Sequence, residues 1–269
     1  MKTNRIVALL LLQNGWLVQS KSFSRFLRVG NPIDAVKRLS EWGADELVYL
    51  DITSKNYSQN FRKDLKSSPH IEILEILRVA SRFAFMPMTV GGKINKLSEI
   101  ESRLSAGADK ISINSKVIDN PIFVKESAEE FGSQCIVVSV DIKTHLNRYR
   151  VYDHRTNSIV DVDLLDWIKR LQDLGAGEIF LNSVDRDGSK QGMDIELIEM
   201  VSNTVKIPVV ACGGVGKWQD FEEALTKTKV DAVAAANIFH HTDQSVFLAK
   251  KYLLDQGLNV RPPELIVID

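Results

Sequence analysis

The chain has 269 residues, of which 44% are hydrophobic and 26% charged, and its formal net charge is -1 at pH 7. This balance argues against the strongly basic surface that a partner nucleic acid or an anionic membrane attracts. No apolar run is long enough to span a bilayer, so we expect a globular cytoplasmic protein. Cys135 and Cys212 lie in apolar runs and are expected to be buried free thiols.

Short apolar runs alternate with amphipathic stretches along the whole chain. The start, "MKTNRIVALLLL", has the basic and apolar order of a secretory signal, but its apolar stretch is short and no cleavage site follows, so we interpret it as a first strand. The runs are continuously apolar, which is typical of strands covered on both faces. Strands are predicted at residues 5–11, 46–52, 86–90, 110–114, 135–141, 178–183, 208–212 and 232–235.

The stretches between the strands have helical periodicity, and several end in glycine, which commonly terminates helices. Helices are predicted at residues 32–43, 70–83, 97–107, 120–132, 162–175, 194–205, 218–228 and 243–257. Eight strands that alternate with eight helices predict an α/β fold, a (β/α)8 TIM barrel formed by residues 1–269 as a single domain.

The chain also repeats itself after about half its length. "ADELVYLDIT" is echoed by "AGEIFLNSVDRDG", and "MPMTVGG" is echoed by "IPVVACGG". Two half-barrels, each with a glycine pair after its third strand, would carry two related anion sites on one face. A polar loop insertion at 54–70 and a hairpin excursion at 144–161 interrupt this symmetry, and both are expected on the same C-terminal face.

Reacting groups of a parallel barrel lie at the C-terminal ends of its strands. Asp141 is the sharpest candidate because it terminates an otherwise apolar strand. Glycines at these ends let backbone N–H groups approach phosphate oxygens, so a phosphorylated substrate is expected. The candidate phosphate- and substrate-binding residues are Gly91, Gly92, Asn114, Ser115, Asp187, Gly188, Gly213, Gly214 and Asn237.

Several of these residues have a plainer interpretation. Asp51 either takes part in the chemistry or only pairs with cations at the barrel mouth, and Asp187-Gly188 suits a simple turn. The five histidines show no metal-ligand spacing, and we interpret His240-His241 as structural. We therefore expect no metal site and no cofactor.

Together these motifs resemble the cyclase subunit of imidazole glycerol phosphate synthase. The residues that carry the resemblance are "DELVYLDIT", "TVGG", "GADKISIN", "FGSQCIVVSVD", "LGAGEI", "NSVDRDGSKQG", "ACGGVG" and "IFHH". The resemblance implies a glutaminase partner that docks on the bottom of the barrel and releases ammonia. The ammonia then passes through the barrel and cleaves and cyclises a phosphoribosyl nucleotide at the top, where two aspartates act as the acid/base pair.

The chain departs from the family pattern at its C-terminal face. The family's strand-five aspartate is matched by Asp141, but Leu11 stands where the strand-one aspartate is expected. Leucine cannot transfer a proton, and loss of a positioned acid/base group typically costs about 10²–10⁴-fold in rate. Lys93 replaces a third glycine after "VGG", and Gln19 replaces an expected lysine.

The opposite end of the barrel matches the family. By resemblance, Arg5, Glu46, Lys110 and Glu178 correspond to the charged ring that gates the ammonia channel, and Thr89 and Ser112 to its polar lining. A buried charged ring costs desolvation free energy unless its members pair, although such rings also plug barrels. A bacterial subgroup with a similar leucine-rich opening is thought to supply ammonia to a separate amidotransferase that makes acetamidino sugars, and this chain resembles it.

Four hypotheses remain open on these observations. The first is an ammonia-channelling paralogue with altered cyclase chemistry. The second is a lyase/cyclase of histidine biosynthesis in which Asp141, with Asp51 or Asp187 nearby, is sufficient, and the third is a non-catalytic scaffold that activates its glutaminase. The fourth, a related isomerase, is weaker because it would need aspartates at both strand ends and no gate. Leu11 separates the second hypothesis from the first and third, and the gate separates the first from the third.

Overall fold

The computed structural model describes residues 3–21, 25–53, 72–240 and 245–263. The insertion expected at 54–70, and His241, lie outside these residues. Eight parallel strands form a closed barrel, because β7 pairs with β10 and β12 returns to β1. The barrel strands are, in spatial order, β1 (Arg5–Gln13), β4 (Glu46–Asp51), β5 (Met88–Gly91), β6 (Lys110–Ile113), β7 (Ile136–His145), β10 (Glu178–Ser183), β11 (Val209–Cys212) and β12 (Ala232–Ala235). The predicted (β/α)8 barrel is confirmed.

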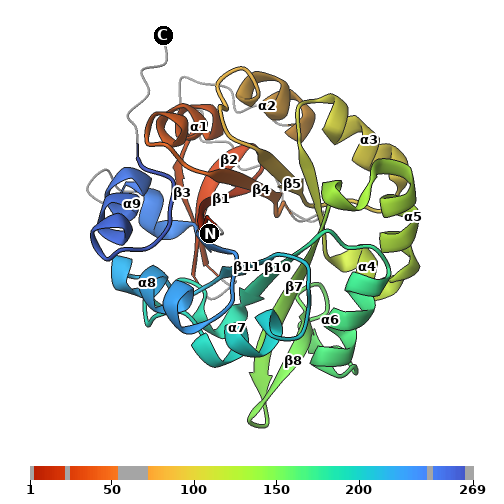
Figure 1. The fold of residues 1–269 in the computed structure, drawn as a ribbon. Helices are drawn as coiled ribbons and strands as arrows, with labels where there is room; N and C mark the ends of the chain where they lie inside the picture. The colour runs from red at the N-terminus through yellow and green to blue at the C-terminus, as the bar shows by residue number, and fades with distance from the viewer. Residues whose placement is uncertain (1–2, 22–24, 54–71, 241–244, 264–269) are drawn as a thin grey trace.

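Helices surround the strands in chain order (Figure 1). They are α1 (Pro32–Glu41), α2 (Ile73–Ala80), α3 (Leu97–Ser105), α4 (Ser115–Asp119), α5 (Ile122–Phe131), α6 (Leu164–Asp173), α7 (Ile195–Ser202), α8 (Trp218–Lys227) and α9 (Val246–Asp255). Short 3-10 turns lie at η1 (Ser133–Cys135), η2 (Val184–Arg186) and η3 (Asn237–His240). The sequence did not predict α4; Asn120 separates it from α5 because the residue before Pro121 is forced into an extended conformation.

A repeated aspartate joins neighbouring strands at the N-terminal end of the barrel. The residue just before β4, β6 and β12 is an aspartate whose carboxylate accepts the backbone N–H of the preceding barrel strand. The pairs are Asp45 with Ile6, Asp109 with Met88 and Asp231 with Val209. The matching position before β10 is Gly177, where a Cβ would lie 2.0 Å from the carbonyl oxygen of Ser133. The recurrence before three of four alternate strands agrees with the repeats seen in the sequence.

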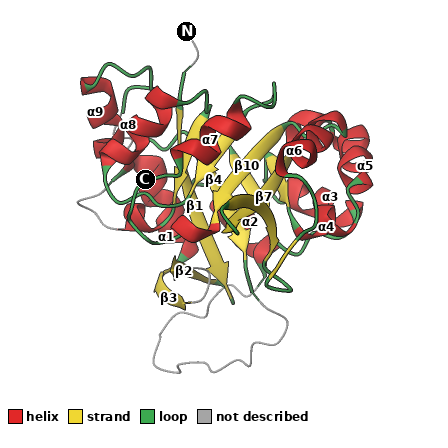
Figure 2. Cartoon of the chain, turned by 90° about the horizontal axis from the view of Figure 1, so that it is seen from below, coloured by secondary structure: helices red, strands yellow, loops and turns green. Residues whose placement is uncertain are grey.

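Two antiparallel hairpins extend the barrel at its C-terminal end. β2 (Trp16–Lys21) and β3 (Arg25–Gly30) continue from β1, and β8 (Arg148–Asp153) with β9 (Ser158–Ile159) continue from β7. Figure 2 shows the β2–β3 hairpin beyond the end of β1. The first hairpin was not predicted, although Asn14-Gly15, with both residues at positive φ, is a strong hairpin signal.

Side chains on each barrel strand alternate between an outer and an inner apolar cluster, as the period of two requires. On β1, Ile6, Ala8, Leu10 and Leu12 pack outward, beneath the helices. The inner cluster fills the barrel itself and consists of Val7, Leu9, Leu11, Val18, Val48, Val137, Phe180, Val210, Cys212, Ala232 and Ala234. Both cysteines are free thiols, and burial raises the pKa of Cys212 to about 12. No helix among the described residues combines the length and apolarity needed to cross a membrane.

Candidate functional site

Four charged side chains form a closed ring at the N-terminal end of the barrel axis. Each begins its strand: Arg5 on β1, Glu46 on β4, Lys110 on β6 and Glu178 on β10. Arg5 donates to both glutamates, and Lys110 reaches the same two carboxylates at 3.0 and 2.9 Å. Every member therefore contacts both of its opposite-charge neighbours, so the positive and negative charges alternate around the ring.

The ring is buried on its anionic side and open on its cationic side. The glutamates are buried, whereas the side chains of Arg5 and Lys110 are 27% and 22% exposed. Burial lowers the pKa of Arg5, but attraction to Glu178 and Glu46 outweighs it and the net pKa is raised. Because two buried carboxylates without partners would be costly, the two cations hold the ring together.

The two residues proposed as polar channel lining lie next to this ring. Thr89 on β5 is buried and donates its hydroxyl to Glu46 Oε1 at 2.9 Å, and Ser112 on β6 is also buried. Beyond them, the inner apolar cluster lines the axis as far as Leu11. The axis therefore changes from charged to polar to apolar from the N-terminal end towards the C-terminal end.

At the C-terminal end, Asp141 on β7 is only 4% exposed and both of its oxygens are engaged. Asn114 donates to Oδ2 at 2.8 Å, and Asn182 of β10 donates to Oδ1 at 2.9 Å. Two amide N–H groups thus orient the carboxylate across three neighbouring strands. Asn114 precedes Ser115 and α4 but makes no capping bond with its side chain, which is turned to Asp141 instead.

A histidine that was not singled out in the sequence completes this cluster. His154, just after β8, places Nδ1 3.4 Å from Asp141 Oδ2, and its side chain is 43% exposed. The hydrogen bond to Asp141 raises the pKa of His154 above its ordinary value and outweighs the lowering by burial. Sequence spacing could not reveal the contact, because only the β7–β8 hairpin folds His154 back onto its own strand.

Leu11, at the position expected to carry the second acid/base group, has apolar neighbours. Leu11 is 9% exposed and belongs to the inner cluster. It pairs with Leu50 on β4 and with Val18 on the unpredicted hairpin strand β2. Neighbours of this kind would favour the neutral form of a carboxyl group introduced at position 11, without preventing it from exchanging a proton.

The first glycine pair lies in a tight turn after β5. A Cβ on Gly92 (φ 100°) would meet the carbonyl oxygen of Asp51 at 2.2 Å, so glycine is required there. Lys93 also has positive φ, 56°, and its amino group lies 3.0 Å from Asp51 Oδ2. Asp51 therefore pairs with a cation at the barrel mouth, which supports the plainer of its two interpretations.

The second glycine pair follows β11 and lies beside the loop after β10. Gly213 and Gly214 both have positive φ, and a Cβ on Gly214 would meet Gly192 O at 2.1 Å. In the neighbouring loop, Asp187 accepts a hydrogen bond of 2.7 Å from the Ser20 hydroxyl of β2.

Asn237, at the end of β12, donates to the backbone oxygen of Ser20 at 2.7 Å. Gly188 packs against the same strand, where a Cβ would lie 2.8 Å from Ser20 O. Ser20 therefore joins Asp187, Gly188 and Asn237, three of the predicted site residues. Asn237 Oδ1 is buried without a hydrogen-bond partner, so an acceptor atom is left unsatisfied here.

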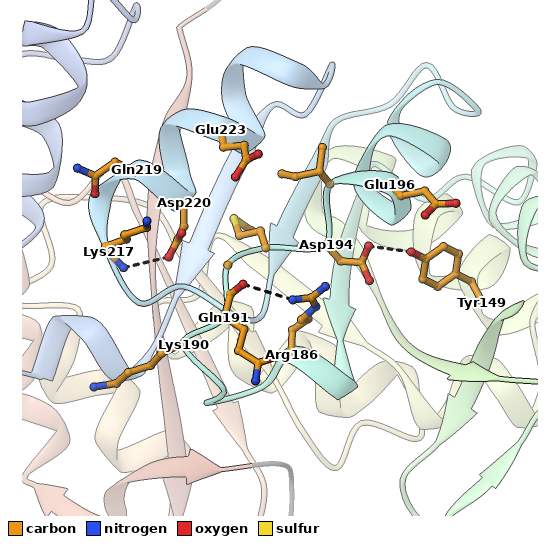
Figure 3. Close-up of a pocket in the computed structure, with 13 residues that line it drawn as sticks. Tyr149, Arg186, Lys190, Gln191, Asp194, Glu196, Lys217, Gln219, Asp220 and Glu223 are labelled. Atoms are coloured by element: carbon orange, nitrogen blue, oxygen red, sulfur yellow. Dashed lines mark hydrogen bonds between the residues drawn. The ribbon is translucent and has the colours of Figure 1, made fainter. Parts of the chain in front are cut away.

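A pocket of about 570 Å³ lies between the starts of α7 and α8, and Asp141 is not among the residues that line it (Figure 3). Its charges are mixed, and several are already used: Asp194 accepts from Tyr149 OH, and Asp220 accepts from the backbone of Gly216 and Lys217. These contacts cap helices and hold the β8 hairpin. We assign this pocket no role in the chemistry.

The described residues contain no group of three or more His, Cys, Asp and Glu side chains placed to hold a metal ion. What the C-terminal face offers is an oriented carboxylate with an imidazole beside it, flanked by two glycine turns. Such a face suits proton transfer on a ligand that carries anionic groups.

The fold and the two ends of its axis define a (β/α)8 barrel with a charged ring below and a carboxylate-centred face above. The family model described as "Histidine biosynthesis protein" matches residues 5–245, and the chain belongs to that family. A protein of Vibrio vulnificus (strain YJ016), provisionally named imidazole glycerol phosphate synthase subunit hisF2, is 41% identical over 257 residues, 96% of this chain and 90% of that protein. The expected resemblance to a cyclase-type subunit, as a paralogue, is confirmed.

Proposed function

We propose that the chain is the barrel subunit of a glutamine amidotransferase complex of the imidazole glycerol phosphate synthase type. A glutaminase partner would dock at the N-terminal end, and ammonia would enter through the ring and move along the axis to the C-terminal face. The ring of Arg5, Glu46, Lys110 and Glu178 carries this proposal. Its charges lie on the barrel axis, where the resemblance places the entrance of the ammonia channel.

The lining above the ring supports passage of a small neutral molecule. Ammonium would lose hydration in the apolar inner cluster, whereas ammonia loses far less because it carries no charge. Thr89 and Ser112 offer hydroxyls at the transition between ring and cluster. A charged entrance followed by an apolar path would therefore select the neutral form.

We further propose that the reaction at the C-terminal face is altered. A lyase/cyclase reaction of the family type would convert a phosphoribosyl nucleotide to imidazole glycerol phosphate. With Leu11 in an apolar setting, the cyclisation would be slower and ammonia would be passed to a separate sugar amidotransferase. The leucine-rich opening and the similarity to a subunit named hisF2 support this role.

The ring is tested by Glu46→Lys in the purified complex with its glutaminase. Reversal of one charge breaks the alternation, so we expect glutamine hydrolysis to continue while glutamine-dependent product formation falls at least about tenfold, with ammonium salt restoring it. Glu126→Lys, an exposed reversal on α5, is the matched control and should remain coupled. Unchanged coupling in Glu46→Lys would rule out the conduit.

A scaffold that only activates the glutaminase is the second candidate, and the apolar setting of Leu11 favours it. This alternative predicts that the barrel stimulates glutamine hydrolysis but forms no product, even with ammonium salt. Turnover of the phosphoribosyl nucleotide with ammonium salt separates the two functions. Leu11→Asp, assayed in parallel, shows whether the lost carboxylate alone explains a barrel that forms no product.

A further inference from the structure

We propose that His154 is the proton-transfer residue of the C-terminal face and that Asp141 is the carboxylate that positions it. The inference rests on the proposed function, since it assigns a residue to the reaction of the same face. It replaces the family arrangement of two aspartates on β1 and β7 by an aspartate and a histidine that both belong to the β7–β8 hairpin.

The geometry of the pair sets the direction of proton transfer. Asp141 faces Nδ1 of His154 at 3.4 Å, which is slightly long for a hydrogen bond, as is common for catalytic groups without substrate. A carboxylate on Nδ1 holds a proton on that nitrogen, so Nε2 is the atom that accepts or donates. Because the side chain is 43% exposed, the imidazole is accessible to solvent and to a ligand.

The residues on either side of His154 hold its backbone in place. Asp153 is buried and accepts Arg155 Nε at 3.0 Å and its backbone N–H at 2.9 Å. The same guanidinium donates to both oxygens of Asp119, at the end of α4, at 2.6 and 2.8 Å. Arg155 therefore clamps the hairpin to the barrel rim, so the imidazole does not depend on a free loop for its position.

The groups around His154 act on its pKa in both directions. The hydrogen bond to Asp141 and the charges of Asp141 and Asp153 raise the pKa, while burial and Arg155 lower it, and the net shift is upward from 6.5. The side chains that orient Asp141 from the neighbouring strands, Asn114 and Asn182, are neutral. A raised pKa makes the imidazole a stronger proton acceptor.

The Asp141–His154 pair replaces the aspartate carboxylate that is missing at Leu11. When ammonia adds to an electrophilic carbonyl carbon, its lone pair forms the N–C bond, the C=O π pair moves to the oxygen, and the nitrogen acquires positive charge. Nε2 of His154 takes one proton from that nitrogen and becomes imidazolium. The imidazolium then gives the proton to the carbonyl oxygen, so charge and atoms balance without any other reagent.

The test is turnover of the phosphoribosyl nucleotide with ammonium salt and no glutaminase, over a range of pH, in wild type and His154→Asn. The asparagine amide preserves a donor towards Asp141 but cannot transfer a proton. With rates compared at a constant concentration of free ammonia at every pH, we expect kcat to fall about 10²-fold or more, KM to stay within about twofold, and the remaining acidic limb of the pH profile to disappear. An unchanged rate or profile in His154→Asn, or a wild type no faster than Asp141→Asn, would overturn the assignment.

Two further arms make the result specific. In the Leu11→Asp background the restored carboxylate should make His154→Asn cost less than about tenfold, whereas an equal cost in both backgrounds would contradict the replacement. NMR titration of His154 needs no activity: its pKa should lie above the ordinary value and drop in Asp141→Asn, and no drop would overturn the pairing. Failure of the conduit alone leaves these ammonium-salt and NMR results unaffected, so the two proposals fail separately.

Discussion

The two ends of the barrel axis differ in how fully they match the family pattern. At the N-terminal end, all four charges of the expected ring are present and each contacts two neighbours of opposite sign. At the C-terminal end, one of two expected carboxylates is Leu11, and Asp141 is joined instead by two amides and an imidazole. One end has all the residues that the resemblance implies, and the other lacks one of them.

This difference teaches that the two ends of such a barrel are separable in physical terms. The ring consists of the first residues of β1, β4, β6 and β10, and Thr89 of β5 donates a hydrogen bond to it. The upper face depends on loops and on hairpins that the lower end does not contact. A change of residues at the top therefore does not require a change in the ring at the bottom.

The largest effect is expected from Asp141→Asn, which removes the centre of the upper face. Its amide cannot act as a carboxylate or hold the Nδ1 proton of His154, so kcat with ammonium salt should fall about 10²–10⁴-fold. Steady-state rates measure this, with the exposed Asp166→Asn of α6 as control. Full retention of the rate would show that the upper face is not the site of chemistry.

A smaller effect is expected at the lower end from Glu178→Gln. Arg5 and Lys110 would each lose one of two carboxylates, and because both cations are partly exposed, water screens much of the loss. We expect the free energy of unfolding to fall by about 1–3 kcal/mol. Urea unfolding beside the exposed Glu126→Gln checks this, and equal stability of the two variants would mean that the ring contributes nothing to the fold.

Lys93→Gly should change stability less and in the opposite direction. It relieves a left-handed backbone (φ 56°) that costs about 1–2 kcal/mol for a non-glycine residue, but it adds chain entropy to the unfolded state. The lost ion pair with Asp51 counts little because the lysine side chain is 45% exposed. Thermal unfolding should show a gain of at most about 1 kcal/mol, and a clear loss would mean that the ion pair outweighs the strain.

The smallest effect concerns the pH dependence of stability at His154. Its pKa in the folded state is raised above 6.5, so its contribution is fully present below the unfolded pKa and is lost as pH rises through the folded pKa. His154→Gln should therefore lower the free energy of unfolding more at about pH 5 than at about pH 9. Denaturant unfolding at both values checks the sign, and a larger loss at high pH would contradict it.

Much of the molecule follows from local pattern. Continuous apolar runs and glycine-terminated amphipathic stretches predicted every barrel strand, and the strand ends predicted that Asp141 and the glycine pairs share one face. The ring residues were predicted from the resemblance and not from local pattern. These predictions succeed because a barrel places the ends of its strands at two fixed faces, so order along the chain specifies which side chains share a face. The split of the helix before Pro121 and the Asn14-Gly15 hairpin were not predicted, but they could have been, since backbone sterics alone cause both.

Only the tertiary structure decided which of these groups touch. The contact of His154 with Asp141, the pairing of Asp51 with Lys93 and the joining of Asp187, Gly188 and Asn237 by Ser20 all cross between loops. Such contacts depend on the register and twist of hairpins, which no local pattern encodes. The sequence by itself therefore determined the barrel and its two faces, while the folded arrangement determined which side chains can exchange a proton.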